Sequence, residues 1–393
     1  MNGKIGMRAF SMLLALLLVS VGVVPAVSAD IEFDMNPSST EDPDAVDFDV
    51  TNFRLPRLQI NSTQEETIVS AELSPVEFDG VYTIPQGSIV HHAAEGVTRV
   101  FSASGEQIIV AVDNRSEYIS TPAGVEKAAT FVHRVPENSH IYSKENTIYV
   151  TDEKGDVLLV VINDRVKKEC ETMTVSDRIG SYFGWLEYAD DVIPGGLTQF
   201  DAYWHVPSAP PAMDYGKAVF IFTGVEPPEE QYGLLQPVLA FYPYENGWNW
   251  YGEAWCYATN PYDPDTDSIV GPRISVNSGD KIKGRILWSD TYNQWYVQFS
   301  DITTGEYSTL WSSLIPRHNN LEVSVVLEAK AVEDNNDMPG DIEFYNMEFK
   351  NNGFPVSGVN FEGHVDSSKP SAITGLWVQE ISDPTNIKLH TNN

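Results

Sequence analysis

The sequence predicts an all-β protein, with a two-sheet antiparallel β-sandwich in its C-terminal half and a smaller β-rich domain before it. Short apolar runs of alternating polarity recur between residues 67 and 381, with turn residues between them. No segment longer than about ten residues shows helical periodicity. All nine tryptophans lie between Trp185 and Trp377, which predicts a large aromatic core or groove in the C-terminal half.

The first 29 residues have the pattern of an export signal. Lys4 and Arg8 precede an apolar run, and the A-V-S-A sequence that follows resembles a signal-peptidase cleavage site. The apolar run is short for a membrane span, and no later stretch approaches ~20 apolar residues. We therefore expect a secreted or cell-surface protein with no membrane span in the mature chain. Residues 30–65 are acidic and contain prolines, which predicts a flexible leader.

Residues 66–170 are predicted to form the β-rich N-terminal domain. Their clearest strands are residues 107–112, 130–133, 147–150 and 157–162. The charged stretch at residues 167–171 is a natural place for a domain boundary or a processing cut. The domain is therefore interpreted either as a permanent domain or as a pro-region.

Residues 175–393 are predicted to form the sandwich, because their strands are longer and more aromatic. Two turn signals, at residues 277–280 and 303–306, connect alternating runs as hairpins do. The expected strands are residues 218–222, 234–242, 248–257, 273–276, 281–288, 295–299, 321–332, 342–349 and 374–381.

The charge of the chain excludes several classes of function. The formal net charge is −32, and removal of the signal peptide would leave 22 − 56 = −34. Such an acidic chain is not expected to bind nucleic acid through its phosphates. The eight histidines are scattered and no H-E-x-x-H or C-x-x-C motif occurs, so neither a metal nor a cofactor is predicted. The simplest interpretation of His91, His92, His133 and His140 is as ordinary strand or surface residues.

The chain contains two cysteines, Cys170 and Cys256. An even number in an exported protein permits a disulfide, which would join the domain boundary to the sandwich. Two free buried thiols are the alternative, since the Cα separation that a disulfide needs cannot be read from sequence. We predict the disulfide.

Two polar residues interrupt apolar strands of the C-terminal half. Gln236 shares a strand face with Leu234 and Val238, and Glu328 shares one with Ser324 and Val326. If both strands belong to one sheet, the carboxyl and amide groups could meet on one face. The alternative is structural: a hydrogen-bonded core amide and a glutamate paired with a neighbouring cation.

A series of segments in the C-terminal half resembles the secreted glutamic peptidases, the eqolisins. The resemblance covers about residues 180–365, and its matching positions are Gln236 and Glu328. It implies a concanavalin A-like sandwich, a polypeptide substrate, an acidic working pH and a pro-region in many members. The segments are LLQPVLAF (234–241), EAWCY (253–257), ISVNSGDKIKGRI (274–286), VQFSDITTGEYST (297–309), LEAKAVED (327–334) and DIEFYNMEF (341–349).

The resemblance implies an endopeptidase that uses a Glu/Gln dyad and an activated water. Glu328 would take a proton from the water as it attacks the peptide carbonyl, and would return it to the leaving amine. Gln236 would donate an N–H to the oxyanion. Glu253 lies in the aromatic strand of the same pattern and is predicted, with four tryptophans, to contact substrate; these are Trp248, Trp250, Trp255 and Trp295.

Two other functions remain open from sequence. The same tryptophans could stack on sugars, in a carbohydrate- or surface-binding sandwich without catalysis. Asp341 and Glu343 place two acids on one strand face, as a glycoside hydrolase would need.

Overall fold

The computed structural model describes residues 48–61, 84–115, 117–165, 182–227, 233–244, 247–257, 260–382 and 384–393. All of them belong to one compact unit, Glu41–Asn393. The predicted signal peptide, residues 1–29, and the first part of the acidic leader lie outside these ranges. Within the described ranges, no helix has the length and apolar character needed to cross a membrane.

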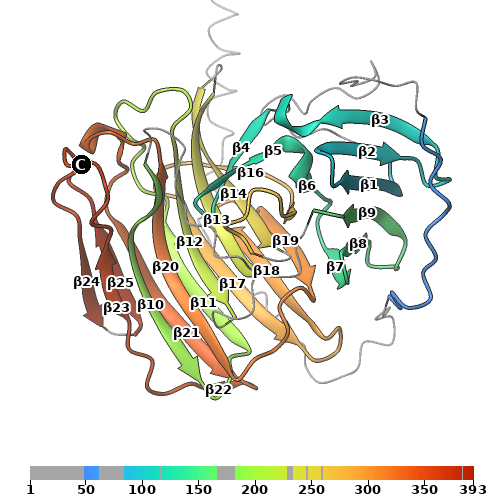
Figure 1. Ribbon diagram of the computed structural model, residues 1–393. Helices are drawn as coiled ribbons and strands as arrows, with labels where there is room; N and C mark the ends of the chain where they lie inside the picture. The colour runs from blue at the N-terminus through green and yellow to red at the C-terminus, as the bar shows by residue number, and fades with distance from the viewer. Residues whose placement is uncertain are drawn as a thin grey trace, which may run out of the picture. The chain divides into compact units, whose positions relative to one another are not determined.

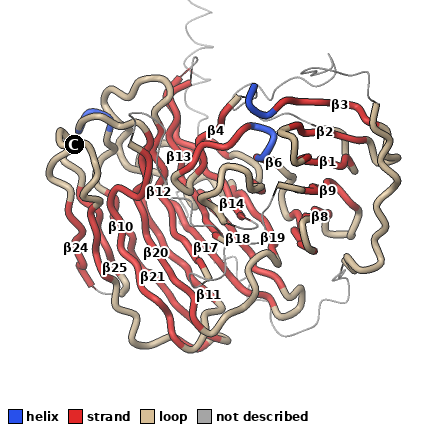
Figure 2. Tube along the Cα trace, in the orientation of Figure 1, coloured by secondary structure: helices blue, strands red, loops and turns tan. Residues whose placement is uncertain are grey.

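The structure confirms the all-β prediction (Figures 1 and 2). In the described part of the chain, helical structure is limited to three short 3₁₀ turns, η1 (Asp113–Arg115), η2 (Ala129–Phe131) and η3 (Asn335–Asp337). The strands form two large sheets and one separate hairpin.

The first sheet contains strands from both halves of the chain. Its strands, in spatial order, are β24 (Trp377–Ser382), β25 (Asn386–His390), β21 (Ile342–Asn351), β11 (Gln199–His205), β17 (Lys281–Ser289), β18 (Gln294–Asp301), β19 (Tyr307–Ser312), β7 (Ser139–Lys144), β8 (Thr147–Thr151), β9 (Val157–Asn163), β1 (Ser88–Ala93), β2 (Val97–Phe101) and β3 (Gln107–Val112), with β22 (Phe354–Pro355) paired to β21.

The second sheet carries the two polar residues of the predicted site. Its order is β23 (Glu362–Val365), β10 (Phe183–Pro194), β20 (Asn320–Lys330), β12 (Ala218–Glu226), β13 (Leu234–Tyr244), β14 (Gly247–Tyr257), β15 (Ser268–Val270) and β6 (Val132–Arg134), with β16 (Ile274–Val276) paired to β14. The separate hairpin is β4 (Tyr118–Thr121) and β5 (Val125–Ala128).

The two sheets face each other across one large apolar core, which confirms the sandwich. Alternation along the strands produces this arrangement. On β17, Ile282, Gly284 and Ile286 are buried, while Lys283 and Arg285 between them are partly exposed. On β20, Val323, Val325 and Leu327 point into the same core, so the residues between them point to the other face of the second sheet.

Strands of the N-terminal segment extend both sheets of the sandwich. β7 pairs in parallel with β19, and β6 pairs in parallel with β15. Backbone hydrogen bonds therefore join the segment to the sandwich at two places. The sequence boundary near residue 170 is consequently not a boundary between sheets.

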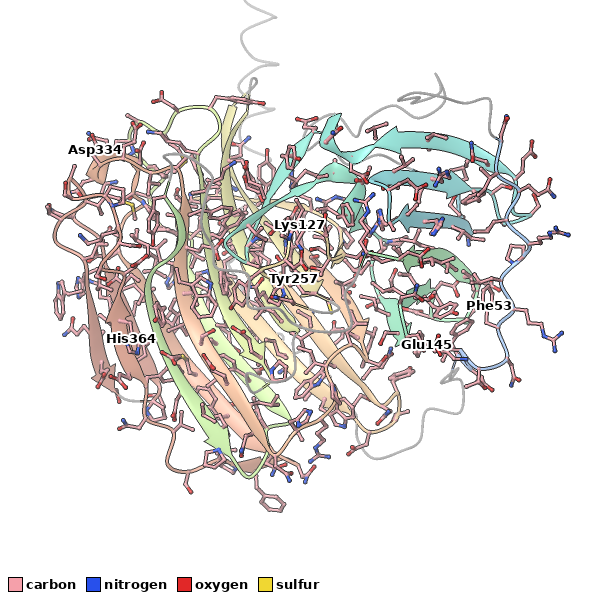
Figure 3. All side chains as sticks on the ribbon, viewed as in Figure 1. Phe53, Lys127, Glu145, Tyr257, Asp334 and His364 are labelled. Atoms are coloured by element: carbon pink, nitrogen blue, oxygen red, sulfur yellow. The ribbon has the colours of Figure 1, made fainter. Side chains whose placement is uncertain are left out.

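Part of the predicted leader is ordered against the N-terminal strands. The Phe48 and Phe53 rings lie 5.9 and 5.4 Å from the ring of Tyr149, and Gln59 forms a bridge with Glu106. Figure 3 labels Phe53 in this segment. Residues 48–61 contain one acidic residue, Asp49, and two arginines, Arg54 and Arg57, so the acidic run of the leader ends before them. Packing of the two half-buried phenylalanines holds this stretch in place.

Cys256 is fully buried on β14. Its Sγ lies 2.9 Å from Ser312 Oγ of β19. The predicted partner, Cys170, lies outside the described residues, and the disulfide stays a prediction.

Candidate active site

Glu328 lies near the end of β20, on the face that points away from the core between the sheets. Its side chain is fully buried. Val326, two residues earlier, belongs to a second apolar cluster on this face. We call this surface the outer face; its cluster includes Phe220 and Phe222 of β12, Leu234, Val238 and Ala240 of β13, and Trp255 and Tyr257 of β14.

The carboxyl group of Glu328 is only partly hydrogen-bonded. Its Oε1 accepts a hydrogen bond of 2.9 Å from the backbone N–H of Gly124. Among the described residues, Oε2 makes no hydrogen bond of good geometry, although Trp185 is the ladder partner of Glu328 on β10. Burial raises the pKa of Glu328 to about 8, and the Gly124 N–H and the Trp185 side chain oppose this only in part. Raised pKa values are common at functional sites, and the contact with the hairpin backbone distinguishes Glu328 from Glu187 of β10, a second buried carboxyl with one unbonded oxygen and a raised pKa.

Gln236 lies on β13 and is also fully buried on the outer face. Within the described part of the chain, neither its Nε2 nor its Oε1 has a hydrogen-bond partner. An unbonded buried polar group costs roughly 1–3 kcal/mol. The arrangement therefore argues against a purely structural amide at this position.

The strand register places Glu328 and Gln236 on one face, two strands apart. Glu328 pairs with Phe220 of β12, and the same ladders put Gln236 at the level of Ser324 of β20. The offset is 328 − 324 = 4 residues along the strands, which corresponds to roughly 13 Å along and roughly 10 Å across the backbone. The two backbones are thus about 16 Å apart, so Glu328 and Gln236 can act on one peptide bond only if their side chains lean toward each other across the face.

The Tyr257 side chain lies on this diagonal, one strand beyond Gln236. Burial and, after it, the charge of Glu328 raise the pKa of Tyr257 well above its usual value. The Tyr257 hydroxyl therefore lies close enough to Glu328 to sense its charge. Sequence reasoning missed Tyr257, because a tyrosine in an aromatic strand carries no functional signal of its own.

The β4–β5 hairpin of the N-terminal segment covers the outer face. Ala123, in its turn, is fully buried in the second apolar cluster, and Ile119 packs against that cluster. The next residue is Gly124, whose φ of 70° favours glycine. The turn therefore presents a peptide N–H directly to Glu328.

A lysine of β20 fixes one side of the hairpin. Lys330 Nζ donates a 2.8 Å hydrogen bond to Ser120 Oγ and forms an ion pair with Glu126. Lys330 is two residues from Glu328 on the same face. The contact that holds the hairpin is therefore adjacent to the candidate carboxyl.

A buried lysine fixes the other side. Lys127 Nζ donates to the backbone oxygens of Asp263 and Thr266 and to Thr266 Oγ1, at 2.7–2.8 Å. It also lies 5.7 Å from the Tyr257 ring centroid, and Figure 3 labels both residues. Burial lowers the pKa of Lys127 to about 7. Sequence reasoning missed this contact, because a lysine in a short strand is usually exposed.

Glu253 is buried and holds a charge cluster rather than an open subsite. Its Oε1 accepts hydrogen bonds from Arg273 Nε at 2.6 Å and Arg134 Nη2 at 2.9 Å, and its Oε2 accepts one from Trp255 Nε1 at 2.9 Å. Burial alone would raise its pKa, but the two guanidinium groups hold the pKa at about 2. Because Arg134 belongs to β6, Glu253 links the sandwich to the N-terminal segment.

We expect Glu253→Gln to lower the free energy of unfolding by about 3–5 kcal/mol at pH 7, because it leaves two partly buried guanidinium groups without their anion. In the wild type this contribution is present above about pH 4.5 and is lost as the pH falls toward 2, since the folded-state pKa is depressed. Urea unfolding measures both effects. Exposed Glu343→Gln is the control and should change stability by less than ~0.5 kcal/mol. Equal unfolding free energies of the wild type and Glu253→Gln would contradict a stabilising role of the Glu253 charge cluster.

The tryptophans predicted to contact substrate occupy different environments. Trp250 and Trp295 belong to the main core, where they fill space between the sheets rather than line a groove. Trp255 belongs to the outer-face cluster beneath the hairpin. The side chain of Trp248 lies outside the described part. Long apolar strands bury large rings on both faces, which sequence alternation alone does not separate.

The acid pair at the start of β21 does not join the outer face. Asp341 forms an ion pair with Lys388 at 2.8 Å and accepts a hydrogen bond from the Thr391 N–H. Glu343 is exposed. Neither residue belongs to the outer-face cluster of the described residues.

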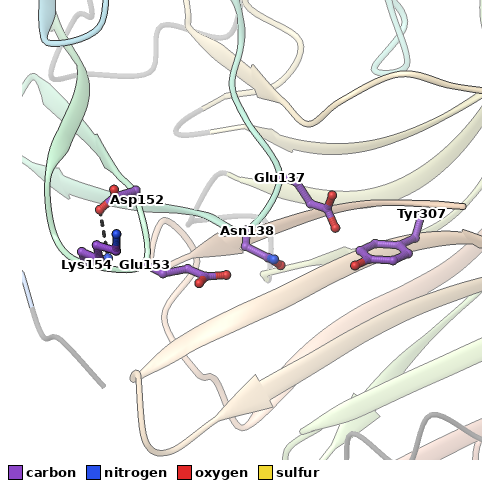
Figure 4. Close-up of a pocket in the computed structure, with 6 residues that line it drawn as sticks. All are labelled: Glu137, Asn138, Asp152, Glu153, Lys154 and Tyr307. Atoms are coloured by element: carbon purple, nitrogen blue, oxygen red, sulfur yellow. Dashed lines mark hydrogen bonds between the residues drawn. The ribbon is translucent and has the colours of Figure 1, made fainter. Parts of the chain in front are cut away.

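An open surface hollow of about 410 Å³ lies elsewhere (Figure 4). It contains none of the predicted site residues, and acidic side chains dominate it. Its lining residues are Glu137, Asn138, Asp152, Glu153, Lys154 and Tyr307.

Comparison with known proteins gives distant structural similarities. No family model matches the chain, and no curated protein matches its sequence. A scytalido-glutamic peptidase bound to a peptide-based transition-state analogue matches with a TM-score of 0.39 and 16% identity, over 53% of this chain and 100% of the other.

Two further structures are less similar. SCP-B, a member of the eqolisin family in complex with the tripeptide Ala-Ile-His, matches with a TM-score of 0.37 and 15% identity, over 53% and 100% of the two chains. The enzymatically active domain of bacteriophage CBA120 tailspike protein 2 has a TM-score of 0.24 and 10% identity, over 62% and 32%. Similarities of this size carry no argument about activity.

Proposed function

We propose that this protein is a secreted, acid-acting endopeptidase of the glutamic type, whose site lies on the outer face and is covered by the β4–β5 hairpin. The observation that carries the proposal is the contact between Glu328 Oε1 and the peptide N–H of Gly124. The candidate carboxyl already binds a polypeptide backbone. A substrate peptide could occupy the same place once the hairpin leaves.

The proposed chemistry divides between two side chains. Glu328, once ionised, removes a proton from a water that attacks the peptide carbonyl, and then returns the proton to the leaving amine. Gln236 donates its unbonded Nε2–H to the oxyanion of the tetrahedral intermediate. No nucleophilic side chain, metal or cofactor takes part in this scheme.

The hairpin would control this chemistry through burial. Under the hairpin, the pKa of Glu328 is about 8, so the group is protonated in acid and cannot act as a base. Removal of the cover admits water and lowers that pKa toward its ordinary value near 4.5. The N-terminal segment would therefore act as a pro-region whose displacement exposes the site and ionises its base.

The test is a point substitution that lifts the hairpin turn and leaves the rest of the chain intact. Gly124→Pro removes the N–H that Glu328 accepts, and a proline ring cannot adopt a φ of 70°. Together these changes destabilise the closed position of the hairpin by about 2 kcal/mol or more, and the fraction of molecules with an open site rises accordingly. Cleavage of a denatured protein substrate between about pH 2 and 6 should therefore increase at least roughly tenfold.

Gly96→Pro is the matched control. Gly96 also has a positive φ and donates its N–H within a hairpin turn, but the position its Cβ would occupy has nothing within 4 Å. Its activity should equal that of the wild type. A folded Gly124→Pro protein that cleaves no substrate in this pH range would refute the proposed peptidase activity. If that inactive variant binds a polysaccharide, carbohydrate binding becomes the proposed function instead.

A further inference from the structure

Three buried side chains from three strand regions converge where the N-terminal segment meets the sandwich. They are His92 on β1, His133 on β6 and Asp267, which directly precedes β15. His92 Nε2 and His133 Nε2 lie 3.0 and 2.8 Å from Asp267 Oδ1. The three potential ligand atoms all lie within 4.8 Å of one another. Sequence reasoning treated both histidines as ordinary, since they are 41 residues apart (133 − 92) and Asp267 is 134 residues beyond His133 (267 − 133).

The hydrogen bonds behind His92 fix which of its ring nitrogens carries a hydrogen. Thr98 has one hydroxyl hydrogen, which it donates to Asp113 Oδ1 at 2.6 Å. Thr98 Oγ1 must therefore accept from His92 Nδ1, which is 2.7 Å away. A neutral His92 consequently has a bare lone pair on Nε2, directed into the cluster.

The position of Asp267 does not satisfy that lone pair. Among the described residues, His92 Nε2 has no hydrogen-bond partner, although Asp267 Oδ1 is only 3.0 Å away. The oxygen is close but lies off the axis of the ring nitrogen. His92 and Asp267 therefore have the relation of two ligands of one metal ion, each pointing at the ion, whereas His133 Nε2 forms a 2.8 Å hydrogen bond with Asp267 Oδ1 that an ion would replace.

The surrounding charge favours a cation. Asp113, Asp263, Asp265 and Asp267 form one electrostatic network with Arg165, Lys127 and, when they are protonated, His92 and His133. Once an ion displaces the two histidine protons, the remaining six groups sum to −4 + 2 = −2 when all are ionised. A divalent cation would neutralise that excess.

We propose that His92, His133 and Asp267 bind a divalent cation of the zinc class. Two imidazoles and one carboxylate are the ligand set that zinc accepts, with a fourth position left for water. Two ligands of a tetrahedral zinc are roughly 3.3 Å apart, so the observed 3.0 and 2.8 Å require shifts of only a few tenths of an ångström.

A second layer of hydrogen bonds already orients two of the ligands. Thr98 accepts from His92 Nδ1, as the partners of metal-bound histidines commonly do. Asn163 Nδ2 donates to Asp267 Oδ2 at 2.8 Å, so an ion bound at Oδ1 would replace only the hydrogen bond between that oxygen and His133 Nε2. The bound ion would join β1 and β6 of the N-terminal segment to the β15 region of the sandwich, and would hold the covering hairpin in place.

The experiment measures metal binding by the tag-free full chain after chelator treatment and dialysis. Titration with ZnCl₂, followed by calorimetry and elemental analysis, should give one zinc per chain, and zinc should raise Tm by a few degrees. MgCl₂ at the same concentration should bind to no such site, because magnesium prefers oxygen ligands. A chain that retains no zinc and shows no zinc-dependent change in Tm would overturn the proposal. The cluster would then be held together by hydrogen bonds alone.

Single substitutions test the ligand assignment. His133→Gln and Asp267→Asn should each weaken zinc binding at least roughly 100-fold, and Thr98→Val should weaken it by about 10- to 100-fold. His91→Asn is the matched control: His91 is the neighbour of His92 on β1 and binds Asp164 instead, so zinc binding should be unchanged. Undiminished zinc binding by both folded ligand variants would contradict the assignment.

A measurement on the wild type covers the case in which the variants do not fold. X-ray absorption of the zinc-loaded chain should show only nitrogen and oxygen ligands, with the multiple-scattering signature of two imidazoles. Ligation by sulfur, or by fewer than two imidazoles, would overturn the site.

Discussion

Glu328→Gln, introduced into the uncovered Gly124→Pro chain, should abolish peptide cleavage while the fold is retained. Glutamine has the shape of protonated glutamic acid, the form that burial favours beneath the hairpin, so packing is preserved. It cannot take a proton from water, and loss of a general base costs about 10²–10⁴-fold in rate. The measurement is kcat on a denatured protein substrate between about pH 2 and 6, with circular dichroism as the check of folding.

Glu187→Gln is the control for that experiment. Glu187 is also a buried carboxyl of raised pKa, on the strand next to β20, but it accepts a hydrogen bond from the His390 N–H and is not part of the outer-face cluster. It should leave kcat unchanged. Gln236→Ala should lower kcat by roughly 10²- to 10³-fold through loss of one oxyanion donor. Full activity of Glu328→Gln would exclude Glu328 as the base.

The second large expected effect is a loss of stability as the pH rises from acid to neutral. Burial raises the pKa of Glu328 to about 8 and that of Glu187 to about 9. Between about pH 4.5 and 8 the unfolded chain loses these protons while the folded chain keeps them. Stability is therefore fully present below about pH 4.5 and is lost as the pH rises through the folded-state values, by on the order of 5 kcal/mol per group.

Urea unfolding at pH 4.5, 6 and 8 measures this loss, and the variants assign it. Glu328→Gln does not titrate, so its stability should fall less between pH 4.5 and 8 than that of the wild type, and Glu187→Gln should remove its own share. Below pH 4.5 the ionised Glu253 cluster weakens as its pKa of about 2 is approached. The maximum of stability should thus lie in mild acid. If the unfolding free energies of the wild type and Glu328→Gln fall by the same amount between pH 4.5 and 8, Glu328 is not protonated in the folded protein.

Local sequence patterns were sufficient to predict the sandwich and the common face of its two polar residues. Alternation on β20 and β13 fixes the direction of Glu328 and Gln236 once both strands belong to one sheet. The same rule could not give their offset along the strands, because register depends on which residues of β12 lie between them. The pairing of Phe220 with Glu328 is set by packing across the sheet.

Contacts between distant parts of the chain were not predictable in this way. Gly124 meets Glu328 across 204 positions of sequence, and its signal is one glycine in a short turn. Glu253 appeared to be a substrate contact because its strand resembles a site strand, yet Arg134 comes from a segment 119 residues away. Such pairings emerge only when separate strands join one sheet.

The pairing of β7 with β19 and of β6 with β15 has a consequence for proteolytic maturation. A cut in the chain between the N-terminal segment and the sandwich would break one covalent bond but none of the ladder hydrogen bonds at those two edges. The two fragments would remain associated, and their separation would expose unpaired strand edges that invite self-association. Cleavage and release are therefore distinct events in this molecule, and a nicked protein would still migrate as one particle under native conditions.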